Sequence, residues 1–245
     1  MLSCIKLQSK NIPSCIKIIE GHASFQNRYR LFASIRQIKV TGLYICNQNL
    51  IRHAILILMS SLKDKILNTA TDLFQTRGIN STGVDTIVAI AGTTKMTLYK
   101  HFHTKEGLII EVLNKSQHDF HHWLDNKLNT NSKVPSDKIK QLFDFIEEWI
   151  TSPKFLGMGF IKASAEFPNE ENPIHQLSSK QSREFRQYIS KLASEANVKD
   201  ADGLALQLSL LFEGAVQAEQ MKRGSGAIKY AKKAAKILID GAINA

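Results

Sequence analysis

The stretch GINSTGVDTIVAIAGTTKMTLYKHFHTKEGL, which covers residues 78–108, decides the fold of this chain. Apolar residues spaced three and four positions apart predict one short helix before Gly92 and a second helix after it. Gly92 can adopt the left-handed backbone of a tight turn, and Thr93 or Thr94 can cap the second helix. Two short helices joined in this way are typical of a helix-turn-helix, whose second helix enters the major groove of DNA.

The second helix carries the polar residues that would face DNA. Because Leu98 and Phe102 point inward, Thr94, Thr97 and His101 share the opposite face. The twelve residues that begin at Thr94 include three lysines and two histidines but no acidic residue. This local charge favours contact with phosphate. The alternative is a solvated helix that is basic without binding DNA.

The same stretch resembles the DNA-binding domain of the TetR family of bacterial repressors. The positions that match the family pattern are Gly78, Val84, Ile87, Ala91, Gly92, Thr97, Leu98, Tyr99, His101, Phe102, Lys105, Glu106 and Leu108. The chain departs from the pattern at Thr93 and Thr94, where Val-Ser is usual, and at Met96, where glycine is common. Met96 is bulkier than glycine and keeps the backbone further from DNA, which affects the base contacts and not the domain.

The resemblance also implies which residues lie at the DNA. The Tyr and His positions of the family usually touch phosphate. Lys105, beside a further helix cap at Thr104, would meet another phosphate. The predicted DNA-binding residues are Thr94, Lys95, Thr97, Tyr99, Lys100, His101 and Lys105. The predicted partner is a double-stranded DNA operator.

Charge and cysteine are unevenly distributed along the chain. Of the net charge of +10, residues 1–58 contribute +7, from eight basic residues and one acid, Glu20. Residues 59–245 hold 24 basic and 21 acidic residues, so the global charge is a poor argument for DNA binding. All three cysteines lie in residues 1–58, and their odd number argues against a disulfide framework. The absence of cysteine from the rest suits a cytoplasmic protein.

Residues 1–58 differ in composition from the rest of the chain. They contain eleven isoleucines and do not sustain helix spacing or caps. Met59 then opens MSSLKDKILNTATDLF, which is how members of the TetR family typically start. We interpret residues 1–58 as a non-native or disordered extension, with Met59 as the true start. A targeting segment and an accessory arm that assists DNA binding are the alternatives.

After Leu108 the apolar pattern predicts helices to the end of the chain and no strands. The expected helices lie near residues 109–128, 137–150, 159–167, 174–196, 204–218 and 228–242. The polar stretch NTNSKVPSD, residues 129–137, predicts a linker, and no segment approaches the length of a membrane span. The predicted fold is all-α. A three-helix helix-turn-helix DNA-binding domain at residues 59–106 precedes a helical ligand-binding and dimerisation domain at residues 107–245.

The helix near residues 204–218 predicts a homodimer. Its sequence, LALQLSLLFEGAVQA, is apolar around most of its circumference, so both a core and a partner are needed to bury it. We expect Leu211 and Ala218, seven positions apart, to face the partner. The resemblance to TetR proteins implies a dimer formed through the last two helices. The alternative is a central core helix in a monomer.

Other clusters give weaker signals of function. The resemblance implies a cavity for a small-molecule effector, and its predicted lining is Phe120, Trp123, Phe143, Trp149, Phe160, Glu166 and Phe185. His118, His121 and His122 have a spacing that could hold a metal, but no further ligand completes a site, so no metal or cofactor is predicted. Glu166 with His175 could do acid–base chemistry, yet no nucleophile accompanies them, so an enzyme is not expected.

These observations predict a ligand-responsive transcriptional repressor. It would bind a palindromic operator as a homodimer, and a small molecule would shift the linker helix and release the DNA. The alternative function is a helical ligand- or metal-binding protein without an operator.

Overall fold

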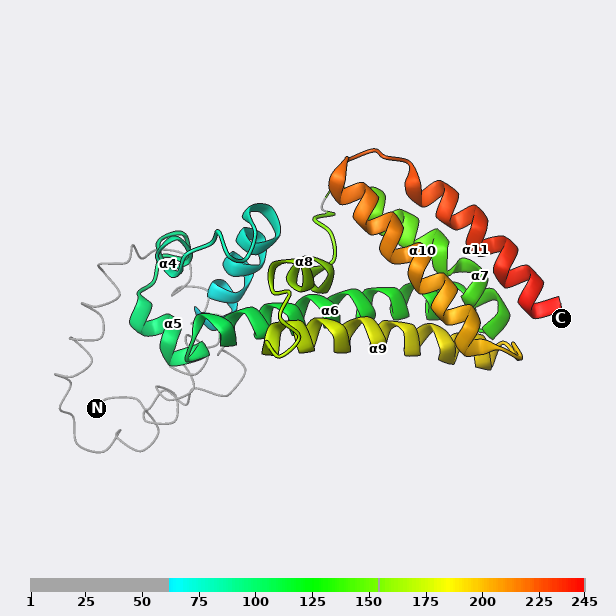
Figure 1. Cartoon of the computed structure of the whole chain (residues 1–245), viewed down its shortest axis with the longest axis horizontal. Helices are drawn as coiled ribbons and strands as arrows, with labels where there is room; N and C mark the ends of the chain where they lie inside the picture. Colours follow the sequence, from blue (N-terminus) through cyan, green and yellow to red (C-terminus); the bar gives the residue numbers. More distant parts are fainter. Residues whose placement is uncertain (1–61, 154, 245) are drawn as a thin grey trace, which may run out of the picture. The chain divides into compact units, whose positions relative to one another are not determined.

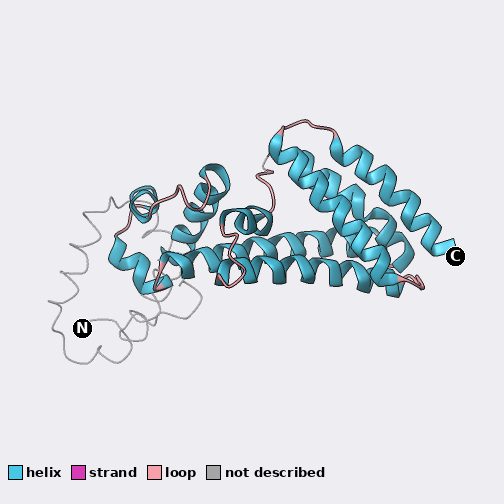
Figure 2. Cartoon of the chain, viewed as in Figure 1, coloured by secondary structure: helices cyan, strands magenta, loops and turns pink. Residues whose placement is uncertain are grey.

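The computed structural model describes residues 62–153 and 155–244, and the regular structure within these ranges is entirely helical (Figure 2). Residues 62–77 form the first described helix. The helices that follow are α4 (Val84–Ala91), α5 (Lys95–Phe102), α6 (Lys105–Asn131), α7 (Pro135–Thr151), α8 (Gly159–Glu166), α9 (Pro173–Glu195), α10 (Ala201–Met221) and α11 (Ala227–Asn244) (Figure 1). The predicted all-α fold is confirmed. The interpretation of residues 1–58 lies outside the described residues.

The helix-turn-helix forms where the sequence predicts it. Gly92 ends α4 with φ 62° and ψ 46°, a left-handed conformation that glycine adopts without a steric penalty. The backbone N–H of Thr93 donates to the Val88 carbonyl at 2.9 Å and closes the turn. The side chain of Thr94 then accepts a hydrogen bond from the backbone of Thr97 and caps α5.

The core beneath the helix-turn-helix is shared with later helices. Leu98 and Phe102 of α5 are buried with apolar residues of residues 62–77, α4 and the first turns of α6. Ala163 of α8 and Ile174 of α9 belong to the same cluster. The DNA-binding helices therefore share a hydrophobic core with α8 and α9 as well as with α6.

The boundary between α6 and α7 differs from the prediction. The linker was expected at residues 129–137, but α6 continues to Asn131 and α7 begins at Pro135. Proline suits the first turn of a helix because its missing N–H would have no partner there. The loop is therefore shorter than the polar sequence indicates.

The C-terminal helices pack into a bundle. α10 lies against α9 and α11, and α7 packs on α11 and α9 (Figure 1). Aromatic side chains fill its centre, where the ring centroids of Phe185 and Phe212 lie 4.5 Å apart and those of Phe120 and half-buried Trp149 lie 4.7 Å apart. Burying each such side chain stabilises the fold by about 1.5–3 kcal/mol.

A buried carboxylate holds the turn between α10 and α11. Glu219 accepts hydrogen bonds from the backbone N–H groups of Gly224 at 2.6 Å and Ser225 at 3.1 Å. These bonds, above all the one from Gly224, lower the pKa of Glu219 despite its burial. The turn that joins the two last helices is therefore fixed by a charged group.

The last two helices leave apolar side chains in solvent. The exposed large apolar residues on them are Leu206, Leu210, Met221, Tyr230 and Ile237. Leu211, which we expected to face a partner, instead packs half-buried against the core of its own chain, and Ala218 is half-buried. The exposed face of α10 is offset by one residue from the predicted one, because Leu208, Phe212 and Ala215 define the inward face.

No helix within the described residues is long and apolar enough to cross a membrane.

Candidate nucleic-acid interface and effector cavity

The first turn of α5 presents two linked threonines. The Thr94 and Thr97 hydroxyl oxygens lie 3.0 Å apart, and Thr94 also accepts the Thr97 backbone N–H at 3.2 Å. Thr94 is exposed and Thr97 half-buried. Thr94 therefore stabilises the start of the helix with two hydrogen bonds, whereas the less exposed Thr97 hydroxyl makes one and keeps capacity for a DNA group.

Lys95 forms an ion pair with an acidic residue outside the acid-free stretch of residues 94–105. Its ammonium lies 2.8 Å from the Asp85 carboxylate of α4, and both side chains are largely exposed. The hydrogen bond to Asp85 raises the pKa of Lys95. The positive charge expected at this end of α5 is thus partly neutralised by the preceding helix.

The outer face of α5 is otherwise open to solvent. Tyr99 and Lys100 are exposed, and Met96, which stands where the family commonly has glycine, is 80% exposed. Ile90 of α4 adds a second exposed apolar side chain. Met96 and Ile90 were not among the predicted DNA-binding residues, and the structure shows both side chains exposed.

His101 and Lys105 are less free than Lys100. His101 is half-buried, and burial, together with nearby Lys100 and Lys63, lowers its pKa. The Lys105 ammonium donates to the Ile79 carbonyl at 3.0 Å. Lys105 therefore supports the loop before α4, and a phosphate would have to share its ammonium with that carbonyl.

Helix α8 holds the same loop from the other side. The Glu166 carboxylate accepts the backbone N–H groups of Ile79 at 2.9 Å and Asn80 at 2.7 Å. Asn80 returns a hydrogen bond from its side chain to the Glu166 carbonyl at 3.1 Å. One turn earlier, Lys162 donates to the carbonyl of Gln75 at 2.5 Å. We call these contacts of Glu166 and Lys162 the α8 clamp.

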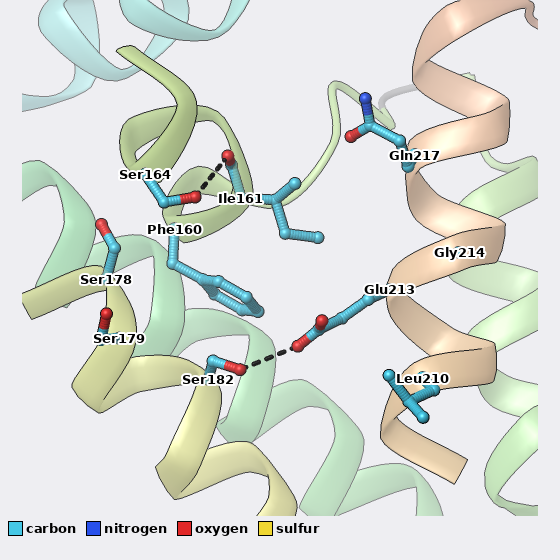
Figure 3. A pocket seen from close by; sticks show the side chains of 10 residues that line it. All are labelled: Phe160, Ile161, Ser164, Ser178, Ser179, Ser182, Leu210, Glu213, Gly214 and Gln217. Carbon is cyan, nitrogen blue, oxygen red and sulfur yellow. Dashed lines mark hydrogen bonds between the residues drawn. The ribbon is translucent and has the colours of Figure 1, made fainter. Parts of the chain in front are cut away.

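An open-sided cavity of about 610 Å³ lies between α8, α9 and α10 (Figure 3). Its lining is Phe160, Ile161, Ser164, Ser178, Ser179, Ser182, Leu210, Glu213, Gly214 and Gln217. Of the seven residues predicted to line an effector pocket, this lining includes Phe160. The serines and Glu213 were not predicted, because serines three and four positions apart resemble a solvated helix face.

The other six predicted pocket residues lie elsewhere. Phe120, Phe143 and Phe185 are buried in the bundle core, and Trp123 and Trp149 pack half-buried against it. Glu166 belongs to the α8 clamp. The aromatic side chains therefore serve mainly as core, and the cavity is more polar than the sequence indicated.

The histidine cluster of α6 does not converge on one point. The rings of His118 and His122 stack with centroids 6.2 Å apart, whereas His121 packs edge-on against Phe185 and Tyr188. Across residues 62–153 and 155–244, no group of three metal-ligating side chains is positioned to hold an ion. His175 contacts the Phe167 carbonyl at 2.8 Å, while Glu166 contacts another loop, so no acid–base pair forms between them.

Comparisons with known proteins agree with this geometry. Residues 66–112 match the model of the bacterial regulatory proteins of the tetR family. The HTH-type transcriptional regulator QacR of Staphylococcus aureus is 48% identical over 54 residues, which span 22% of this chain and 29% of QacR. The negative transcriptional regulator IcaR of the same species is 29% identical over 157 residues, which span 62% of this chain and 80% of IcaR.

The crystal structure of a TetR-family transcriptional regulator from Streptomyces coelicolor superimposes with a TM-score of 0.66 at 25% identity. The match covers 76% of this chain and 95% of that one. Similarity to regulators of this kind therefore extends from the helix-turn-helix through the C-terminal helices.

Proposed function

Since the chain belongs to the TetR family of bacterial transcriptional regulators, we propose that it binds a palindromic operator as a homodimer and represses transcription in the cytoplasm until a small molecule releases it. The observation that carries this proposal is the outer face of α5. Tyr99 and Lys100 are exposed there beside half-buried Thr97, and the opposite face of the helix is buried through Leu98 and Phe102. A rigid helix with exposed donors is what major-groove recognition requires.

The exposed apolar side chains of α10 and α11 that lie outside the cavity support the homodimer: Leu206, Met221, Tyr230 and Ile237. Large apolar side chains left in solvent on adjacent helices mark a contact surface. A two-fold dimer formed through them would place two α5 helices on the two halves of a palindrome. The name of IcaR as a negative regulator supports repression as the outcome of binding.

The position of α8 supports control by a small molecule. Phe160, Ile161 and Ser164 of this helix line the cavity, and Lys162 and Glu166 of the same helix form the α8 clamp. A molecule that changes the position of α8 would therefore move the loop before α4. To release DNA, it must bind the DNA-incompetent dimer more tightly than the competent one.

Sequencing of genomic DNA fragments captured by the full chain tests the proposal. We expect a palindromic sequence to be enriched, and a gel shift with that sequence to give a dimer on one duplex. A variant with Thr97→Ala and Lys100→Ala should lose most of this affinity. The matched control is Lys140→Ala, which removes an exposed lysine from α7. Enrichment of no sequence, or equal binding by all three proteins, would overturn the proposal.

A further inference from the structure

The lining of the cavity between α8, α9 and α10 specifies the charge of its occupant. From its shape and chemistry we infer that it binds a small organic amine, carrying a primary or secondary ammonium beside an apolar group. The inference rests on the proposed function, because it names the effector class of that regulator.

One carboxylate supplies the charge. Glu213 is half-buried, and it is the sole ionisable residue in the lining. Among the described residues, its hydrogen-bond partner is the Ser182 hydroxyl at 2.8 Å, and no ion pair joins it to a cation. A partly buried carboxylate with one neutral partner favours a cationic ligand and disfavours an anion.

Three hydroxyl groups in the lining already donate their protons in hydrogen bonds within the protein. Ser164 donates to the Ile161 carbonyl at 3.0 Å, and Ser178 donates to the Ile174 carbonyl at 2.8 Å. With Ser182 donating to Glu213, three hydroxyls of the lining are left with oxygen lone pairs. Ser179 and Gln217 can still donate or accept. The lining is therefore rich in acceptors, and an ammonium with several N–H groups fits it better than a quaternary cation.

Apolar side chains complete the site beside the carboxylate. Figure 3 shows Phe160 and Ile161 of α8 extending toward the space that Glu213 enters from α10. Leu210 adds a further apolar group to the lining. An amine joined to a short aryl or alkyl chain would meet both kinds of surface. Because the apolar contacts come mainly from α8, such an occupant would contact the same helix that forms the α8 clamp.

Calorimetry on the full chain tests the charge requirement with ligands of equal shape. The probes are phenethylamine, 2-phenylethanol and phenylacetate, with hexylamine and hexanol as a second pair. We expect each amine to bind at least about tenfold more tightly than its alcohol, and phenylacetate to bind least, since a charged hydrogen bond to a carboxylate is worth about that factor.

A pair of glutamine variants then locates the site. Glu213→Gln keeps the size of the side chain and removes its charge, so it should weaken amine binding about tenfold and leave alcohol binding within about twofold. Glu184→Gln, on α9 outside the lining, should leave the preference for amines unchanged. Equal binding of amines and alcohols, an amine preference that survives Glu213→Gln, or no binding by any probe would each overturn the inference.

The same experiment separates this inference from the proposed function. Operator binding and dimerisation of the unsubstituted chain are measured in parallel. If both occur but amines do not bind, the effector class is wrong and the regulator stands. If amines bind through Glu213 but no operator is found, the cavity is a ligand site and the regulatory proposal fails.

Discussion

At the scale of single residues, we expect Thr94 to stabilise helix α5 and Thr97 to contact DNA. Thr94 caps α5, so Thr94→Ala should lower the free energy of unfolding by about 1 kcal/mol as well as weaken DNA binding. Thr97→Ala keeps the backbone N–H that Thr94 caps, so it should weaken operator binding with little loss of stability. Thermal unfolding and gel shifts on both variants measure the two effects. Equal losses of stability would show that Thr97 is also structural.

The ion pair between Lys95 and Asp85 limits the positive charge of the DNA-binding face. Asp85→Asn removes the acid and frees Lys95, so affinity for all DNA sequences should rise, and the slope of log affinity against log salt should steepen by about one unit. The same change removes an acid from the first turn of α4 and should cost about 0.3–1 kcal/mol of stability. Lys95→Ala should change affinity in the opposite direction. A slope unchanged in Asp85→Asn would place Lys95 away from phosphate.

His101 gives DNA binding a predictable dependence on pH. Its pKa in the free protein is lowered by burial and by neighbouring lysines, so the ring is neutral at pH 7. DNA phosphates favour the charged form, so operator affinity should rise as pH falls below about 6.5. The lowered pKa has the opposite effect on the free protein, whose stability declines over the same range. His101→Gln should make affinity nearly independent of pH between 5.5 and 7.5, and a pH dependence that persists would assign the effect to another group.

At the scale of helices, the α8 clamp should decide how firmly the DNA-binding helices are held. Glu166→Gln leaves one acceptor for two backbone N–H groups, so it should destabilise the loop at Ile79 and Asn80 by about 1–2 kcal/mol. Hydrogen exchange should then quicken in residues 62–102 while α10 and α11 keep their protection.

The control for the clamp is Glu170→Gln, which changes an exposed acid in the loop after α8. It should leave exchange unchanged throughout. Uniform loss of protection in Glu166→Gln, including α10 and α11, would mean that Glu166 supports the whole fold and not a joint between two parts of it.

Helices were predictable from sequence because their signals are local. Gly92 and Thr94 mark the turn, and apolar spacing marks each buried face, so every helix was expected within a few residues of its observed place. The polar sequence around Pro135 predicts a linker, but proline is equally compatible with the first turn of a helix, where α7 places it.

The candidate sites depend on contacts between residues distant in sequence, and these were not predictable. Asp85 neutralises Lys95 across a turn, and Glu166 reaches a loop 86 residues earlier in the chain. The resemblance to TetR proteins predicts an effector cavity between the C-terminal helices, and aromatic residues were its expected lining. Packing of α6, α7, α9 and α10 instead buries those rings and leaves Glu213 and the serines at the open space.

At the scale of the whole molecule, dimerisation should be separable from folding. Leu211 is unsuitable for this test because it packs in its own chain, but Ile237 of α11 is 73% exposed. Ile237→Glu should leave the helix content and thermal stability of the subunit nearly unchanged. In a dimer it would bury a charge against the partner, at a cost of several kcal/mol. Sedimentation should therefore show a monomer at concentrations where the unsubstituted chain is a dimer.

Operator binding should fall with dimerisation in this variant, although no residue of α5 changes. One half-site contributes only part of the contacts, so the loss should exceed about tenfold. Val134→Glu is the matched control, because Val134 is 52% exposed and belongs to the turn before α7, not to either of the last two helices. It should remain dimeric with unchanged affinity. An Ile237→Glu protein that stays dimeric and binds the operator normally would place the dimer contact on another surface, and a monomer that keeps full affinity would exclude the two-fold mode of recognition.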